Sequence, residues 1–439
     1  MTVPVPAANS APLHAAAAPT SDDPTAAIAD LAARYLTPNY RNAPVVFHHG
    51  DGPWNIDLAG RHYLDFSGGV AVNVLGHAHP DLVAALQDQV GKLLHQSNYW
   101  HNLYAAPLAR DLCERFSAAA AIAAGTPEPA RAFFCNSGAE ANEALVKVAR
   151  RWHAKIVGRP RPGIVTMEGS FHGRTYAAMS ATAQPKYQAG FEPLVPGFVH
   201  VPFGDLAALE AACTDNVGAV LTEVVQGEGG VNLPPAGWLR AVRALCDARG
   251  MLLLLDEVQT GVGRTGTFYA FEQEGCAPDA LSLAKGLGGG VPIGAMVARD
   301  KVAQALQPGS HATTFGANAL AMRAGCVVLD VLERDGVVDN ARAMGAYLVE
   351  RLRAAFLTRP YTVDVRGRGL LVGVQVRGDP KAVVEAARDR GLLLSVAGTD
   401  VLRLTPPLVV DRGHCDLAVE RLRAAADAAL AGAGQAFSA

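Results

Sequence analysis

Between residues 130 and 300 the chain alternates short apolar runs with segments of helical length. Nearly every position in these runs is apolar, whereas a strand with one face in water is apolar at every second position. Strands buried on both faces have this pattern, as in a parallel sheet covered by helices. The runs are RAFFCN, GIVTME, GFVHVPF, VGAVLTEV, MLLLLDEV, ALSLA and IGAMVA. The pattern predicts a large α/β domain with a mostly parallel sheet.

The two ends of the chain predict a second, smaller domain. The segment VVFHHGDGPWNIDLAGRHYLDFSGG has short strands separated by Gly and Asp turns. Near the other end, TVDVRGRGLLVGVQV and VLRLTPPLVV read as strands with the helix DPKAVVEAARDRG between them. We expect residues 29–90 and 330–436 to form one α+β domain and residues 91–329 to form the large domain. Residues 1–28, rich in Ala, Pro and Ser and without Lys or Arg, predict a disordered tail.

Polar residues close five of the expected strands. In open parallel sheets, ligands bind beyond the carboxyl ends of the strands, so these residues mark the expected site. They are Asn136 to Gly138, Glu168 to Arg174, Glu223, Asp256 with Glu257, and Lys285.

Lys285 is the only charged residue in ALSLAKGLGGGVPIGAM. It could begin a surface loop, as most lysines do. A phosphate-binding loop of the Walker type requires Gly-Lys-Ser/Thr after four spacer residues, and Gly288 to Gly290 lack this sequence. A third interpretation is a desolvated amine at a strand end that attacks an aldehyde. This stretch alone does not decide between the first and the third.

Two other stretches change that balance. Asp256 follows MLLLL and either caps the next helix or presents a carboxylate at the site. Ser137, Gly138 and Ala139 lead into a helix, either as an ordinary capping box with Glu140 or as a seat for an anion. Together, an amine, a carboxylate and a phosphate seat match pyridoxal 5'-phosphate, which has an aldehyde, a ring nitrogen and a phosphate.

Composition narrows the choice of partners. The 439 residues carry a formal net charge of -3, which favours small metabolites over nucleic acid or an anionic membrane. Seven cysteines without a CxxC spacing indicate reduced thiols and predict a cytoplasmic protein. No apolar run reaches the roughly 20 residues of a membrane helix. His77 and His79 lack a third ligand at metal-binding spacing, so we expect structural roles and no metal.

Several motifs in register resemble one family. The chain resembles the class III (ω-amino acid) aminotransferases of pyridoxal-phosphate fold type I, and most of all their acetylornithine/ornithine branch, from about residue 30 to 432. The matching stretches are LDFSGGVAVNVLGHAHP, NSGAEANEALVKVAR, FHGRT, QGEGGV, LLLLDEVQTGVGRTG, LAKGLGGGVPIGAM, GSHATTFGANALA and LRLTPPLVV. Val224 and Ala319 stand where the family has proline, and Ala317 where it has glycine.

The resemblance implies roles for individual residues. Lys285 would bond to the cofactor aldehyde, Asp256 would pair with the ring nitrogen, and Gln259 would contact the phenolic oxygen. Phe171 would stack on the ring, and Ser137, Gly138 and Ala139 would hold the phosphate. Thr314 would reach the phosphate of a neighbouring subunit, which implies a homodimer with shared sites. Arg174 would bind a substrate carboxylate, and Glu228 would pair with Arg403 as a gate between the two substrates.

The implied activity is transfer of the terminal amino group of N-acetylornithine, or a close ω-amine, to 2-oxoglutarate in arginine or lysine biosynthesis. Ornithine, succinylornithine, a carrier-linked lysine and 4-aminobutyrate stay open as donors. An aminomutase is a remote alternative, since we expect such an enzyme to lack the Gln259 and Arg174 motifs. A binding or regulatory module would carry an appended DNA-binding segment or lack Lys285, and neither is present.

Overall fold

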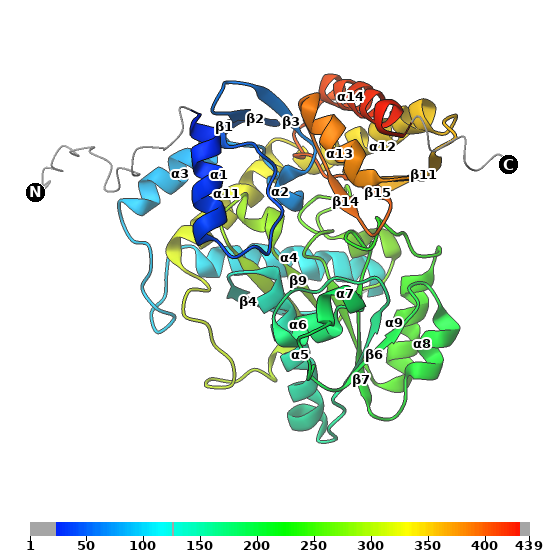
Figure 1. Ribbon diagram of the computed structural model, residues 1–439. Helices are drawn as coiled ribbons and strands as arrows, with labels where there is room; N and C mark the ends of the chain where they lie inside the picture. The colour runs from blue at the N-terminus through cyan, green and yellow to red at the C-terminus, as the bar shows by residue number, and fades with distance from the viewer. Residues whose placement is uncertain (1–22, 125–126, 431–439) are drawn as a thin grey trace, which may run out of the picture.

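A seven-stranded sheet forms the centre of the large α/β part of the computed structural model, which describes residues 23–124 and 127–430 (Figure 1). The strand order is β4-β10-β9-β8-β7-β5-β6. All seven apolar runs of the sequence are strands, as predicted. Their bounds are β4 (Ala130–Cys135), β5 (Gly163–Met167), β6 (Phe198–Val201), β7 (Val217–Glu223), β8 (Leu252–Asp256), β9 (Ala280–Leu283) and β10 (Gly294–Arg299).

Two strands depart from the uniform pattern of buried parallel strands. β10 is antiparallel to both of its neighbours, β9 and β4. Only the short 3-10 turn η3 (Lys285–Gly288) and a glycine-rich loop join β9 to β10, whereas a parallel return needs a crossover of about a dozen residues. β6 lies at the edge of the sheet, and its residues Val199 and His200 are exposed.

The apolar residues of the central strands face two helical layers. On β8, Leu252 and Leu254 pack on the side of helix α5 (Gly138–Trp152). Leu253 and Leu255 join the core cluster on the other side, which includes Phe116 of α4 (Ala105–Ala124). Because alternate residues of a strand point to opposite faces, a run of four leucines fills both layers.

The two ends of the chain meet in the upper part of the molecule (Figure 1). Strand β13 (Leu392–Leu393) pairs in parallel with β3 (His62–Asp65), which joins a late segment to an early one. That sheet also contains β1 (Phe47–Asp51) and β2 (Trp54–Asp57). A separate sheet contains β11 (Thr362–Arg368), β12 (Leu371–Val376), β15 (Val401–Leu404) and β14 (Ser395–Ala397). The domain boundaries near residues 91 and 330 stay predictions.

The prediction that residues 1–28 form a disordered tail is wrong for the last residues of that range. Helix α1 (Pro24–Tyr35) begins inside residues 1–28, and residues 1–22 lie outside the described part of the chain. The Asp23 side chain accepts a hydrogen bond of 2.9 Å from the Thr25 N–H, and Pro24 takes the first helical position. An Asp cap followed by Pro is a helix start signal, which the low complexity of the flanking sequence obscured.

The remaining helices connect and cover these sheets. They are α2 (Gly68–Ala71), α3 (Pro80–Val90), η1 (His153–Val157), α6 (Tyr176–Ala181), α7 (Pro185–Gln188), α8 (Leu206–Ala212), α9 (Trp238–Arg249), η2 (Ala270–Glu274), α10 (Asp300–Ala303), α11 (Ala319–Arg334), α12 (Val337–Phe356), α13 (Pro380–Asp389) and α14 (Arg412–Leu430). Among the described residues, no helix has both the length and the apolar character that crossing a bilayer requires.

Candidate active site

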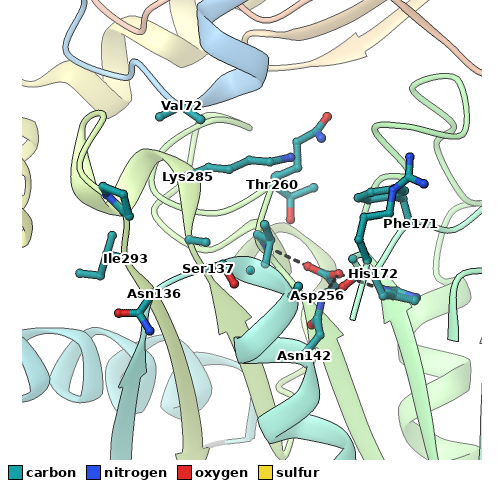
Figure 2. A pocket seen from close by; sticks show the side chains of 18 of the residues that line it. Val72, Asn136, Ser137, Asn142, Phe171, His172, Asp256, Thr260, Lys285 and Ile293 are labelled. Carbon is teal, nitrogen blue, oxygen red and sulfur yellow. Dashed lines mark hydrogen bonds and ion pairs between the residues drawn. The ribbon is translucent and has the colours of Figure 1, made fainter. Parts of the chain in front are cut away.

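A cavity of about 420 Å³ opens at the carboxyl edge of the large sheet (Figure 2). Its walls come from segments that follow β4, β5, β7, β8 and β9 and from the loop before β10. Most of the residues expected at the site line it: Ser137, Gly138, Ala139, Phe171, Arg174, Asp256, Gln259 and Lys285. The expected location of the site, beyond the strand ends, therefore contains a cavity large enough for a small molecule.

Lys285 lies at the end of β9 with its side chain directed across the cavity (Figure 2). Its φ is 45°, in the left-handed region that residues other than glycine rarely adopt. A strained backbone conformation persists only where the surrounding structure holds it in place, and such residues are concentrated at functional sites. Burial lowers the pKa of the ammonium to about 8, although the residue keeps some surface facing the cavity. The surface-loop interpretation of Lys285 is therefore wrong.

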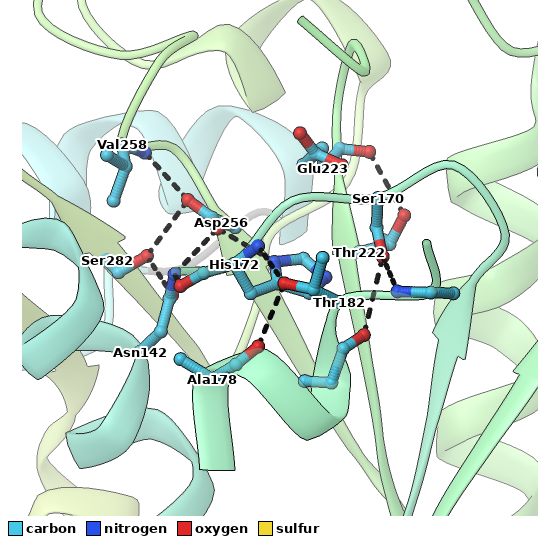
Figure 3. Close-up of polar contacts among 12 residues, drawn as sticks. Asn142, Ser170, His172, Ala178, Thr182, Thr222, Glu223, Asp256, Val258 and Ser282 are labelled. Carbon is cyan, nitrogen blue, oxygen red and sulfur yellow. Dashed lines mark hydrogen bonds and ion pairs between the residues drawn. The ribbon is translucent and has the colours of Figure 1, made fainter. Parts of the chain in front are cut away.

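Asp256 is buried at the end of β8 and has four hydrogen-bond partners (Figure 3). Its Oδ2 lies 2.7 Å from Asn142 Nδ2 and 2.8 Å from His172 Nδ1. Its Oδ1 accepts from the Val258 N–H at 2.9 Å and the Ser282 hydroxyl at 3.3 Å. Burial alone would raise the pKa of Asp256, but these hydrogen bonds, that of His172 foremost, hold it below its usual value. The carboxylate therefore stays ionised.

The sequence did not predict the three side chains that form hydrogen bonds with Asp256. Asn142 lies one helical turn after Gly138, and His172 is inside the FHGR motif, but neither spacing points to Asp256. Ser282 was the clearest signal, because it is the one polar residue in the strand ALSL. It also donates to Asn142 Oδ1 at 2.7 Å, which orients that amide toward the carboxylate.

The start of helix α5 combines the two interpretations of Ser137. Its hydroxyl caps the helix by accepting from the Glu140 N–H at 3.2 Å, but the Glu140 carboxylate accepts from the Asn136 N–H at 2.9 Å and not from that of Ser137, so the cap differs from a regular capping box. The first N–H groups of a helix have no carbonyl partner within it, so those of Gly138 and Ala139 are available to an anion. A side chain on Gly138 would come within 2.6 Å of Val258 Cγ1, so only glycine lets the turn lie this close to the loop after β8.

Buried Arg403 contacts Gln259 and the partly exposed Glu228, and Gln259 lines this cavity. Arg403 is only 3% exposed and donates to Glu228 Oε1 at 2.5 Å and to Gln259 Oε1 at 3.1 Å. Gln259 Nε2 donates to the same Glu228 oxygen at 3.2 Å. Burial would raise the pKa of Glu228, but Arg403 and the neighbouring Lys285 lower it below its ordinary value. The expected pairing of Glu228 with Arg403 is present, and Gln259 is part of it.

Arg174 lies at the mouth of the cavity with its guanidinium over aromatic rings. It stacks at 4.0 Å from the centre of the Tyr187 ring and 5.5 Å from that of Phe171. Phe171 meets Tyr187 edge to face at 5.6 Å. Within the described ranges, no ion pair to Arg174 is present. An exposed guanidinium held on rings is free to bind a carboxylate.

Thr314, like Glu228 and Arg403, is an expected site residue that does not line the cavity. It is exposed, in the segment between α10 and α11. The side chains of Asn98 and Asn102 hold this segment by donating to Gly316 O at 2.9 Å and Ala317 O at 2.6 Å. Ala317 has φ of 64°, so its methyl group strains a position where glycine is favoured.

His77 of the His77 and His79 pair makes a contact with a buried carboxylate. His77 Nε2 lies 3.0 Å from Asp65 Oδ2, and that carboxylate also caps the turn at Ser67 and Gly68. Across residues 23–124 and 127–430, no group of three or more His, Cys, Asp or Glu side chains is arranged to hold a metal ion.

A family model for aminotransferase class-III matches residues 35–426. The chain belongs to the class III aminotransferases. Among curated relatives, the acetylornithine aminotransferase of Xanthomonas axonopodis is 47% identical over 90% of this chain and 95% of its own length. That of Myxococcus xanthus is 45% identical over 89% and 95%.

Solved structures support the same family. An ornithine aminotransferase from Toxoplasma gondii matches with a TM-score of 0.86 and 34% identity, over 92% of this chain and 95% of that one. The N-acetylornithine aminotransferase of Stenotrophomonas maltophilia matches with a TM-score of 0.76 and 37% identity, over 92% and 99%. A second structure of the Toxoplasma enzyme has pyridoxal phosphate at partial occupancy in its active site. This aminotransferase uses pyridoxal phosphate, as its family does.

The cavity fits that cofactor. Three of its polar atoms are buried without a hydrogen-bond partner among the described residues: Glu223 Oε2, His172 Nε2 and Thr260 Oγ1. Apolar side chains, including Val72, Val258 and Ile293, supply walls for a flat ring. Together with the Lys285 amine, the Asp256 carboxylate and the helix start, these groups match an aldehyde, a ring nitrogen and a phosphate.

Proposed function

We propose that this aminotransferase moves the terminal amino group of N-acetylornithine to 2-oxoglutarate, giving the semialdehyde and glutamate. The observation that carries the choice of donor is the 45–47% identity to acetylornithine aminotransferases over nearly their full length. Backbone likeness favours the Toxoplasma ornithine enzyme instead. Because ornithine and acetylornithine enzymes share one fold, we give sequence identity more weight for the donor.

We assign the cofactor contacts to the residues that line the cavity. Lys285 would carry the cofactor through its amine, Asp256 would face the ring nitrogen, and the start of α5 with Ser137 would hold the phosphate. When bound, pyridoxal phosphate supplies a ring that accepts electrons from the reacting carbon, and an ionised Asp256 supports this by keeping the ring nitrogen protonated. Phe171 would lie against the ring.

Lys285 would also handle protons during the reaction. An amine with a pKa near 8 is partly neutral at neutral pH, so its Nζ can take a proton from the substrate carbon that bears the amino group. A fully exposed lysine, with its pKa above 10, would rarely be in that form. The desolvated position at the end of β9 therefore provides a base where the substrate carbon would lie.

Arg174 and Arg403 divide the recognition of carboxylates. We assign the distal carboxylate of the donor to Arg174, whose guanidinium has no acidic partner in the described chain. Arg403 would bind the α-carboxylate of glutamate or 2-oxoglutarate after release from Glu228. With the ω-amine donor, the Glu228 contact neutralises Arg403, which would otherwise be a buried, unpaired charge.

We further propose a homodimer in which Thr314 and its segment complete the partner's site. Bulky apolar side chains near this segment are exposed in the single chain: Tyr99 is 92% and Phe315 is 62% exposed. Such a surface is typical of a protein interface. We place the enzyme in arginine biosynthesis in the cytoplasm, in accordance with its proposed substrate.

The proposed donor is tested with a panel of ω-amines and 2-oxoglutarate. We expect kcat/KM for N-acetylornithine to exceed those for ornithine and 4-aminobutyrate at least tenfold. Succinylornithine and a carrier-linked lysine complete the panel, because they also present a terminal amine and a distal carboxylate. If another amine has a higher kcat/KM than N-acetylornithine, the proposed donor is wrong and that amine is the better candidate.

The gate is tested by following the two half-reactions separately through single-turnover absorbance changes. Glu228→Ala should lower kcat/KM for the ω-amine at least tenfold while leaving glutamate within about threefold, because Arg403 is then permanently available. Arg403→Ala should mainly impair the half-reaction with 2-oxoglutarate. Equal losses in both half-reactions for both variants would contradict the gate and indicate that Glu228 and Arg403 form a fixed salt bridge.

The shared site is tested by mixing two impaired variants, Lys285→Ala and Thr314→Ala. After random exchange, half of the dimers are mixed, and each mixed dimer has one site with both native residues. We therefore expect about one quarter of wild-type activity. Mass spectrometry verifies the exchange. Mixed dimers without any regained activity would show that Thr314 serves its own subunit or none.

A further inference from the structure

The loop that carries Glu228 is closed on itself and docked on the four-stranded sheet of β11, β12, β15 and β14. Gln226 and Asn232 form an antiparallel bridge at its base, with backbone hydrogen bonds of 3.0 Å in both directions. The Gly398 N–H donates to the Glu228 carbonyl at 2.8 Å. Val231 packs with Val225, Leu371 and Val401 in a small buried cluster. We refer to residues 226–232 as the Glu228 loop.

Two arginines of that sheet face the Glu228 loop from a single row. Arg366 on β11 is paired with Gly373 on β12, and Gly373 is paired with Arg403 on β15. Residues directly opposite one another in neighbouring strands project to the same face. The glycine between the arginines leaves room for the loop, since a side chain there would lie 3.1 Å from Val231 Cβ and 2.8 Å from Val401 Cγ1.

The two arginines hold the Glu228 loop by different chemistry. Arg403 binds the loop through a carboxylate, that of Glu228, which a substrate carboxylate can replace. Arg366 binds only neutral groups of the loop: it donates to Val231 O at 3.0 Å and to Gly230 O at 2.7 Å. Its charge is already paired with Asp364 at 3.1 Å, and Gln375 accepts a further bond at 2.8 Å. A substrate carboxylate therefore has no reason to displace the loop from Arg366.

We propose that Arg366 is a positioning residue that anchors the Glu228 loop while Arg403 exchanges Glu228 for the dicarboxylate substrate. The anchor keeps the Glu228 carboxylate close to Arg403, so that the pair re-forms once the dicarboxylate leaves. Without it, Arg403 stays unpaired for part of each cycle, and binding of the ω-amine suffers selectively. This inference rests on the proposed function, because it requires an enzyme that alternates between two kinds of substrate.

The first test compares Arg366→Met with a matched control, Arg377→Met. Arg377 also donates to two backbone carbonyls, Pro360 O at 3.1 Å and Thr362 O at 3.3 Å, but these lie outside the Glu228 loop. We expect Arg366→Met to lower kcat/KM for the ω-amine half-reaction at least tenfold and to change the glutamate half-reaction less than threefold, the direction expected of Glu228→Ala. Arg377→Met should change neither. Arg366→Lys should restore part of the loss, because its ammonium can still donate to one loop carbonyl.

The second test measures amide hydrogen exchange of residues 226–232 by mass spectrometry. Arg366→Met should accelerate exchange of this segment at least tenfold, and Arg377→Met should leave it unchanged. Gly373→Ala, which forces a methyl group against Val231, should act like Arg366→Met and provides a second variant if the first folds poorly.

Equal losses in both half-reactions, or unchanged exchange in the Glu228 loop, would overturn the role of Arg366. Failure of the proposed function looks different. If wild-type enzyme does not react with N-acetylornithine, that donor is wrong, and the half-reactions are measured with the best ω-amine of the panel. The exchange experiment needs no substrate and decides the anchoring in either case.

Discussion

A buried carboxylate that must stay charged is the constraint on which the site depends. Asp256 is removed from water at the end of β8, and an uncompensated charge there would cost several kcal/mol. Its compensation comes from four segments: Asn142 on α5, His172 after β5, Val258 in the following loop and Ser282 on β9. The charge is therefore maintained only if the central strands and α5 are assembled in register. The same assembly places the start of α5 and the Lys285 amine around one cavity.

The second buried charge, Arg403, joins the four-stranded sheet of β11, β12, β15 and β14 to the large part of the chain. Asp256 at the end of β8 and Lys285 just after β9 belong to the large part of the chain and would be needed for both substrates. Arg403 enters from β15 and is neutralised by Glu228, a residue of the large part. An enzyme with one pocket for two substrates needs one group that changes partners and a framework that does not. In this chain Arg403 is suited to the first role, and the neutral contacts of Arg366 to the second.

The sequence predicts the strands well because nearly every position in the runs is apolar, and the central strands are buried between two helical layers. Lys285 and Asp256 were identifiable as candidates because each is a charged residue at the end of an apolar run, where ligands of an open parallel sheet bind. The antiparallel direction of β10 was not predicted, because it depends on the short connection from β9 and not on the apolar pattern of the strand itself. Asn142, His172 and Ser282 come together only through the order of the strands, and the row of Arg366, Gly373 and Arg403 only through their register. The role of Thr314 at a partner's site stays a prediction, because the structure describes a single chain in which this residue is exposed.

The most direct measurement is the pH dependence with which pyridoxal phosphate labels the cofactor-free protein. After reduction with borohydride at a series of pH values, peptide mass spectrometry gives the site and extent of labelling. Only the neutral amine reacts, so labelling should rise with pH through the lowered pKa of Lys285, with a midpoint at about 8. The label should be on Lys285 and absent from the Lys285→Ala variant. Labelling mainly at another lysine, or a midpoint above 10 as for an exposed lysine, would contradict the assignment of Lys285 as the buried reactive amine.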